Sequence, residues 1–194
     1  CLVGSEMCIR DRLKNGKMEA LNNALFGYIN NGLNTLPTSE QIYDPARFFI
    51  DERYEELTSK TIELDNYILI DEGSFGALDL VYLMQDKIGQ TNAINAAVGI
   101  GGGNWKDYED SSGNLLMTLK LTGDNKDELQ EIYEAFILWG NAQSRFSSSE
   151  SYLNGSLFKG STNFWIYNDQ SFIRIVLSQD LDLLNSISNQ LNEF

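Results

Sequence analysis

The sequence contains no histidine, only two cysteines and only two prolines. Without histidine, this chain lacks the commonest zinc ligand and the imidazole general base that many hydrolases use. Basic residues are also scarce, because 14 Lys and Arg stand against 28 Asp and Glu and the formal net charge is −14. A charge of this sign and size repels phosphate backbones and anionic lipid surfaces. We therefore expect no nucleic-acid partner.

The remaining composition is that of an ordinary globular protein. Hydrophobic residues make up 42% of the chain and charged residues 22%, which excludes collagen-like and intrinsically disordered classes. No apolar stretch has the length of a transmembrane helix. A chain of this size is expected to form one domain, or one large and one small domain.

Both cysteines lie in the first twelve residues, which differ in character from the rest. This string, CLVGSEMCIRDR, resembles the translation of a transposon-based sequencing adapter, so we interpret residues 1–12 as an adapter-derived scar. It lacks the unbroken apolar run of a signal peptide. Without it the net charge is unchanged and no cysteine remains, which excludes disulfides and thiol nucleophiles. We expect the native sequence to begin near Leu13, after the loss of its true start.

Residues 13–60 have the pattern of a small helical region followed by a linker. Apolar residues at helical spacing predict an amphipathic helix over Met18–Ile29. Pro37 and Pro45 bracket a short segment, 38–44, in which Ser39 is a candidate helix cap. Residues 51–61 are mostly polar and acidic. We interpret 13–60 as the helical remnant of a missing N-terminal domain plus a linker.

Residues 61–194 are expected to form one α+β domain. It opens with a short apolar run, Tyr67–Ile70, that is typical of a buried strand. Ser74 is a candidate N-cap for a largely buried helix that reaches Lys87, and a second helix is predicted over Thr91–Val98.

Two β-hairpins and two further helices complete the predicted domain. The hairpins join Trp105–Glu109 to Leu115–Leu121 and Phe164–Tyr167 to Phe172–Leu177. A helix capped by Asp124 follows the first hairpin, with its acidic side chains on a solvated face, and a closing helix follows the second. The Ser-rich stretch 144–160 is expected to be a mobile surface loop, with a short linker as the alternative.

The predicted order is therefore β-α-α-β-β-α-β-β-α. The predicted turns, 110–114 and 168–171, are too short for the crossover that parallel strands need. We expect an antiparallel sheet built from two β-hairpins, with helices packed on one face.

Four groups of residues invite a chemical interpretation, and each has a simpler structural one. The glycine run 99–103 lacks the Lys and Ser or Thr of a phosphate-binding loop. The pairs of adjacent acidic residues are expected on solvated faces or in turns. The stretch 107–118 does not have the ligand spacing of a calcium loop. Two serines next to glycine have no visible base. We therefore assign no catalytic, cofactor-binding or metal-binding residue; the groups are Gly99–Gly103, the pairs Glu55-Glu56, Asp71-Glu72 and Glu109-Asp110, Asp107–Thr118, and Ser74 with Ser156.

Aromatic residues make up 11% of the chain and fall on predicted elements. We expect most of them in the core. The alternative is that some line a binding site on the open side of the sheet, because helices on one face leave the other face free. The six residues concerned are Trp105, Trp139, Trp165, Tyr108, Tyr133 and Tyr167.

Three strings resemble the C-terminal half of a group of prokaryotic surface and lipoprotein-type proteins that look like zinc metallopeptidases. The first, 36–45, is similar to a PPTSTEQ-x-x-HP motif, and Ser74–Leu78 and Gly99–Gly102 follow in the same order. In that group the zinc-binding HExxH helix lies in the N-terminal half. The resemblance therefore implies that the catalytic part precedes the residues present here.

The departures from the family pattern remove charged residues. Ala77 stands where the family has the Glu of TLGE, and Ile100, Gly103 and Asn104 replace the Trp, Asp and Arg of GWGGDR. We therefore carry over none of these positions as functional.

The resemblance implies a non-catalytic accessory or binding domain of a surface metallopeptidase-like protein. Its partner would be the missing N-terminal domain of the same chain, and the intact protein would be extracellular or bound to the cell surface. This segment would need no cofactor and would not itself be an enzyme. The alternative is an independent domain that binds small molecules or hydrolyses them with carboxylates alone.

Overall fold

The computed structural model describes residues 43, 57–64, 66–188 and 190. The chain divides into two compact units, 1–53 and 54–194. The adapter-like residues 1–12 and the helix predicted at 18–29 lie outside the described residues. In the bracketed segment 38–44 only Tyr43 is described, and it is helical. The fold below is that of the second unit.

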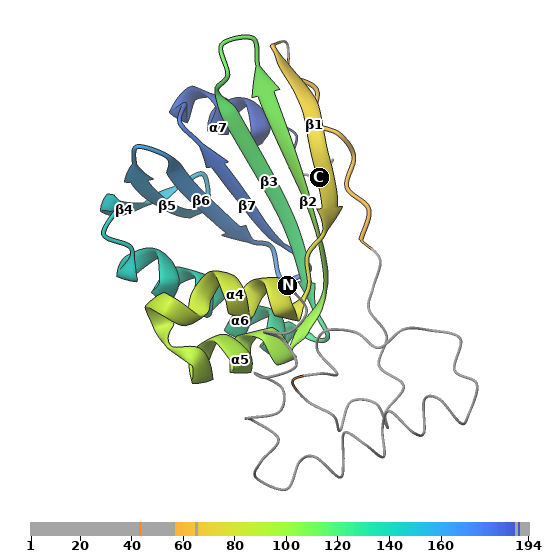
Figure 1. Ribbon diagram of the computed structural model, residues 1–194, viewed down its shortest axis with the longest axis vertical. Coiled ribbons are helices and arrows are strands. Elements are labelled where there is room, and N and C mark those ends of the chain that lie inside the picture. Colours follow the sequence, from red (N-terminus) through yellow and green to blue (C-terminus); the bar gives the residue numbers. More distant parts are fainter. Residues whose placement is uncertain (1–42, 44–56, 65, 189, 191–194) are drawn as a thin grey trace, which may run out of the picture. The chain divides into compact units, whose positions relative to one another are not determined.

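A seven-stranded antiparallel sheet, in the order β1-β2-β3-β7-β6-β5-β4, forms this unit (Figure 1). The α+β class and the antiparallel sheet are thereby confirmed. The described elements are β1 (Tyr67–Ser74), α4 (Ala77–Ile88), α5 (Gln90–Val98), β2 (Ile100–Asp110), β3 (Leu115–Gly123), α6 (Lys126–Ala142), β4 (Phe146–Tyr152), β5 (Gly155–Gly160), β6 (Asn163–Asn168), β7 (Ile173–Ser178) and α7 (Leu181–Ser188).

Both predicted hairpins are confirmed. Tyr108 pairs with Leu116 in β2–β3, and Trp165 pairs with Val176 in β6–β7. Strands β2, β3 and β6 are longer than their apolar patterns, because backbone pairing continues through polar and glycine residues, and β7 is shifted by one residue. The helix start differs from prediction, since Asn125 and not Asp124 caps α6 by accepting hydrogen bonds from the backbone of Asp127 and Glu128.

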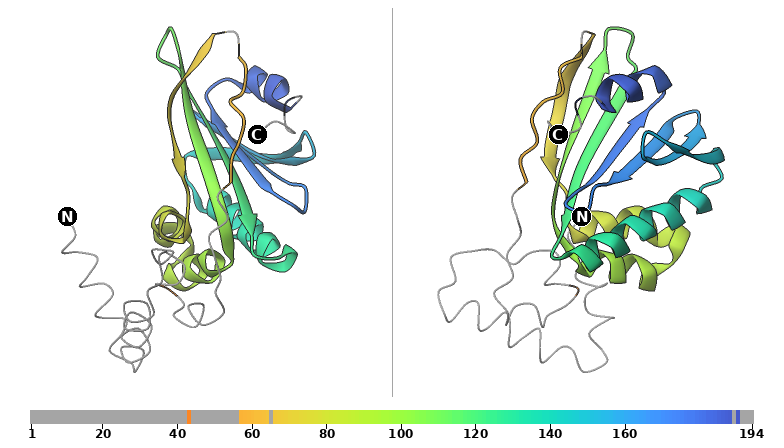
Figure 2. Two further views of the ribbon diagram at one scale, coloured as in Figure 1. Left: turned by 90° about the vertical axis from the view of Figure 1, so that its right-hand side faces the viewer. Right: turned by 180° about the vertical axis from the view of Figure 1, so that it is seen from behind.

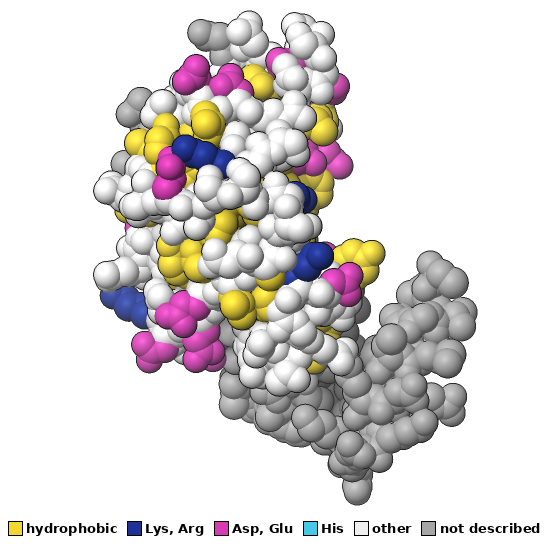
Figure 3. Space-filling view, turned by 90° about the vertical axis from the view of Figure 1, so that its left-hand side faces the viewer, with side chains coloured by type: hydrophobic (Ala, Val, Ile, Leu, Met, Phe, Trp, Pro, Cys, Tyr) yellow, Lys and Arg dark blue, Asp and Glu magenta, His cyan; other side chains and the backbone are white. Residues whose placement is uncertain are grey.

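The segment 144–160, expected to be a mobile loop, forms the β4–β5 hairpin instead. Its side chains show no alternation because β4 is the outer strand, and residues 147–151 are exposed. Figure 3 faces the β4 side, where uncharged side chains and backbone cover most of the surface. The expectation was wrong because backbone pairing to β5, and not an apolar face, holds this strand.

One face of the sheet packs against α6, on which α4 and α5 lie in turn. An aromatic cluster forms this contact: Phe164 of β6 lies 6.3 Å from Phe136 and 5.4 Å from Trp139, between ring centroids. The indole Nε1 of Trp139 also donates to the backbone oxygen of Leu83 in α4, at 3.1 Å. The three helices α4–α6 thus lie on one face. The expectation that all helices pack on one face is wrong for the closing helix α7, because the central strands are apolar on both faces.

The closing helix α7 lies on the opposite face. Leu184 and Ile187 of α7 pack with Tyr108, Trp165 and Val176, which alternate with the residues facing α6. The extended segment 57–64 covers the same face, with buried Ile62 in this cluster and its backbone N–H donating to the hydroxyl of Tyr108. In Figure 2 (right) α7 lies in front of the strands, on the side hidden in Figure 1.

Two expectations of burial are wrong. The run Tyr67–Ile70, predicted to be a buried strand, is part of the exposed edge strand β1. The helix α4 buries one side only, and Tyr82 on its other side is 81% exposed. Ser74 does not cap α4; it ends β1, and the helix starts after Gly76, whose N–H donates to Asp79.

Candidate functional site

The glycine run 99–103 opens strand β2 and forms no phosphate loop. A Cβ at Gly103 would lie 2.5 Å from Cδ2 of Leu121 and 2.8 Å from the backbone oxygen of Phe75. A Cβ at Gly99 would lie 2.6 Å from Cβ of Glu128. These glycines therefore permit close packing of β2 against its neighbours.

The two serines considered as nucleophiles lie in surroundings that suit structural roles. Ser74 is exposed at the end of β1. The hydroxyl of Ser156, in β5, lies 3.3 Å from the hydroxyl of Tyr133 in α6, and this contact joins helix to sheet.

The acidic neighbours in the sequence are separated by the strands. Glu72 points to the α7 side, where it forms an ion pair of 2.8 Å with buried Lys106, while Asp71 lies on the other side. Asp110 closes the β2–β3 turn, because its carboxylate accepts hydrogen bonds from Ser112 and Asn114. The pair Glu55-Glu56 lies outside the described residues.

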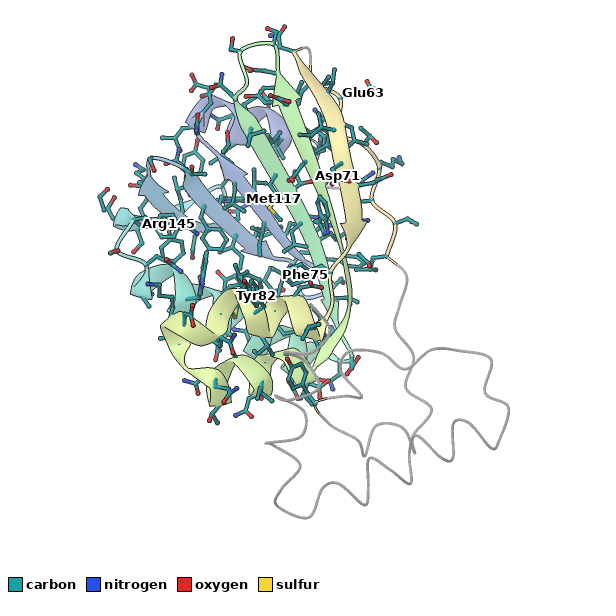
Figure 4. The ribbon with its side chains drawn as sticks, viewed as in Figure 1. Glu63, Asp71, Phe75, Tyr82, Met117 and Arg145 are labelled. Carbon is teal, nitrogen blue, oxygen red and sulfur yellow. The ribbon has the colours of Figure 1, made fainter. Side chains whose placement is uncertain are left out.

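Over the three strands β1–β3, the described residues leave part of the α6 side of the sheet uncovered. We call this surface the open face and define it by the side chains that the register places there. Ile68, Glu109 and Leu115 form one row across the strands, Asp71, Asp107 and Met117 form the next, and Gly73 and Trp105 begin the third. Figure 4 views this side, with Asp71 on β1 and Met117 on β3.

The open face is apolar at one end. Ile68 is 69% exposed and Leu115 is 56% exposed, and both belong to the same row. Met117 and Trp105 are half-buried. The side chain of Trp105 lies across Gly73, where a Cβ would be 2.9 Å from the indole Nε1. Exposed aliphatic side chains beside a fixed indole are typical of a contact surface.

The middle of the open face carries two facing carboxylates. Asp71 of β1 and Asp107 of β2 are direct cross-strand partners next to a β-bulge. Burial, and then the charge of Asp71, raise the pKa of Asp107. Like charges directly opposite each other destabilise a sheet, so a cation placed beside them would be attracted.

A second charged cluster lies on the α7 side of the sheet and is held by its own contacts. Arg174 forms an ion pair with Asp169, which also accepts hydrogen bonds from the backbone of Ser171 and Phe172. The amine of Lys120 lies 4.4 Å from the ring centroid of Phe172, and burial lowers the pKa of Lys120. This cluster fixes the β6–β7 turn and is not the stronger candidate site.

The aromatic residues divide between core and surface. Tyr108, Trp139 and Trp165 are buried in the core as expected. Tyr133, Tyr167 and Trp105 are half-buried, and of the six only Trp105 belongs to the open face. The alternative interpretation expected aromatic residues on a free face opposite the helices. It is wrong for that face, because α7 and the segment 57–64 lie there, and Trp105 is on the α6 side.

The facing pair Asp71 and Asp107 was missed by sequence reasoning, which grouped acidic residues by adjacency. Only the strand register indicates this pair, because it places residues 36 positions apart side by side. Among the described residues, no group of three His, Cys, Asp or Glu could hold a metal ion. No helix in the described ranges is long and apolar enough to cross a membrane.

The open face therefore combines exposed aliphatic side chains, one half-buried indole and three carboxylates. Such a surface can attract a partner that is itself apolar and basic. Comparisons of the chain with protein-family models, with curated proteins and with solved structures find no match.

Proposed function

We propose that this chain is a non-catalytic accessory or binding domain, the C-terminal part of a surface metallopeptidase-like protein, and that it acts through the open face. The observation that carries the proposal is the row of Ile68, Glu109 and Leu115 beside the row of Asp71, Asp107 and Met117. The motif order from Leu36 to Gly102 supports the parent family. On this proposal the domain presents substrate or partner to a catalytic half encoded upstream.

Sequencing the intact gene tests whether this chain is part of a surface metallopeptidase-like protein. If the reading frame continues upstream of Leu13 into a signal sequence and an HExxH helix, the accessory role and the surface location are supported. If the frame begins within a few codons of Leu13, both are overturned.

The intact protein tests the role of the open face. Trp105→Ala and Leu115→Ser should raise KM for a protein substrate and leave kcat unchanged, because they weaken binding away from the reacting bond. Ser149→Ala, on exposed β4, is the matched control and should change neither constant. Equal kinetics for all three variants would contradict a binding role for this face.

The second candidate is a hydrolytic domain that uses carboxylates alone, and the Asp71 and Asp107 pair is the observation that favours it. A carboxylic acid with a raised pKa beside an ionised carboxylate can divide acid and base roles. The measurement is hydrolysis of 4-nitrophenyl acetate and of a fluorescence-quenched peptide by the chain alone. Turnover that Asp107→Asn abolishes would establish this candidate in place of the first.

A further inference from the structure

We propose that strand β1 binds an extended segment of a partner protein as an added strand, and that this segment is apolar in one half and basic in the other. The inference rests on the proposed function, since β1 borders the open face, and it names the class of partner. The position of β1 in the sheet, its side chains and its charge each support it.

The first observation is that β1 ends the sheet. Among the strands that the structure describes, β1 pairs with β2 and is first in the order, so its outer backbone groups face away from this sheet. The edge-on view in Figure 2 (left) shows the segment 57–64 displaced toward α7, beside β1 and not in line with its edge. An added strand would take the row of N–H and C=O groups that an edge strand presents.

The second observation is that β1 lacks most of the features that protect edge strands. Its sequence, YILIDEGS, has no proline and no lysine, and its exposed aliphatic residues are consecutive: Ile68 is 69%, Leu69 36% and Ile70 47% exposed. Among its own residues, the protective features are the bulge between Leu69 and Asp71 and the charged side chains of Asp71 and Glu72 in its second half. The opposite edge, β4, instead presents serines and a glutamate.

The third observation is the order of side chains along β1. The apolar residues lie before the bulge, and Asp71 and Glu72 lie after it. Glu72 is already paired with Lys106 on the α7 side, but Asp71 faces Asp107 on the open face. A basic side chain on an added strand would lie directly beside Asp71 and relieve this repulsion.

The order of apolar and acidic residues along β1 therefore determines the order of residues expected in the partner segment. An antiparallel segment would place its basic residues first and its apolar residues last, and a parallel segment would have the reverse order. A second copy of β1 fits less well, because antiparallel pairing would bring the acidic half of one strand against the apolar half of the other. In such a pairing, the acidic residues of β1 would also gain no cationic partner.

The experiment uses the full chain and the acetylated, amidated peptides KKTVIV, VIVTKK and EETVIV. We expect one of the two basic peptides to slow amide hydrogen exchange about tenfold at the N–H groups of β1 that point away from β2. EETVIV should have little effect. Ile68→Lys combined with Ile70→Lys should abolish the protection, because cations on the edge repel the basic half and remove the apolar contact. Ser149→Lys combined with Ser151→Lys, on β4, is the matched control and should retain it.

Four results would overturn the inference, and they separate it from the proposed function. Equal binding of a peptide N-methylated at alternate residues would show side-chain binding without an added strand, which leaves the open-face role intact. Failure of all peptides, with KM effects of the open-face variants preserved, would again remove only the strand addition. Sedimentation showing a dimer that Ile68→Lys dissociates would make a second copy the occupant. Failure of the peptides together with unchanged KM would remove both.

Discussion

Gly103 shows how a single residue without a side chain holds β2 in place. A Cβ at this position would lie within 3 Å of both Leu121 and the backbone of Phe75. The glycine run of the sequence therefore has a packing function at this point, and its resemblance to a phosphate loop is accidental.

We expect Gly103→Ala to lower the free energy of unfolding by about 1–3 kcal/mol, because an inserted methyl group overpacks a well-filled site. Urea denaturation followed by circular dichroism measures the change. Ser149→Ala, at an exposed position, is the control and should change stability by about 0.5 kcal/mol or less. Equal stability of the two variants would mean that β2 and its neighbours can move apart without cost.

Asp110 is a residue whose ionisation is changed by hydrogen bonds of the fold. Hydrogen bonds from the side chain and backbone of Asn114 lower the pKa of Asp110. The carboxylate form therefore stabilises the turn above the pKa of the unfolded chain, and this contribution is lost as pH falls through the folded pKa.

Asn114→Ala should move the pKa of Asp110 upward, toward its ordinary value, because the side-chain donor is removed. Titration of the Asp110 carboxyl carbon by NMR measures the shift. Ser112→Ala keeps the backbone N–H that donates to Asp110, so its titration should match that of the original chain. An unchanged pKa in Asn114→Ala would contradict the assigned cause.

At the scale of elements, the segment 57–64 is held to the sheet by side chains of β2. Tyr108 accepts a hydrogen bond from the N–H of Ile62, Asn104 accepts one from Ser59, and Lys106 donates to Thr61 at 3.5 Å. Ile62 itself is buried against α7. Ile62 of this irregular segment is therefore part of the core, and the contacts of Ser59 and Thr61 attach the segment to the sheet.

Tyr108→Phe should destabilise the unit by about 1–3 kcal/mol, because the buried N–H of Ile62 loses its acceptor while the ring remains. Amide exchange at Ile62 should accelerate more than exchange in β6. Tyr82→Phe, on the exposed side of α4, is the control and should leave the free energy of unfolding and the amide exchange at Ile62 unchanged. Uniform acceleration throughout the sheet would indicate global unfolding instead of local release of the segment.

At the scale of the whole molecule, the excess of acidic residues is the dominant electrostatic feature. The net charge of −14 favours solubility but opposes compaction through self-repulsion. Lys106, Lys159 and Arg174 each form an ion pair with one carboxylate. Because acidic residues outnumber basic ones two to one, such pairs cannot neutralise the chain.

We expect the unfolding temperature to rise with ionic strength between about 10 mM and 150 mM NaCl, where the screening length falls from roughly 30 Å to 8 Å. A gain of 1 kcal/mol corresponds to about 2–4 °C for a chain of this size. Differential scanning calorimetry measures the change, and KCl should give the same result as NaCl. A fall in unfolding temperature would mean that attractive pairs outweigh the repulsion.

Elements whose pattern is local could be predicted from the sequence alone. Alternation in Leu115–Leu121 and helical spacing in α6 and α7 predicted strands and helices in the correct order, because these periods reflect burial of one face. The turns at 110–114 and 168–171 likewise indicated antiparallel hairpins. The absence of histidine excluded imidazole chemistry from this chain, since composition alone decides which side chains are present.

The covered faces and the edge strands, by contrast, depend on tertiary packing. Strand β4 has no apolar alternation and exists because its backbone pairs with β5. The apolar run of β1 is exposed because none of the described helices α4–α7 covers the sheet edge there. Helix α7 lies opposite α4–α6 because residues on both faces of the central strands are apolar. The carboxylates of Asp71 and Asp107 meet through register alone. Each of these depends on pairing between distant residues, which local periodicity does not encode.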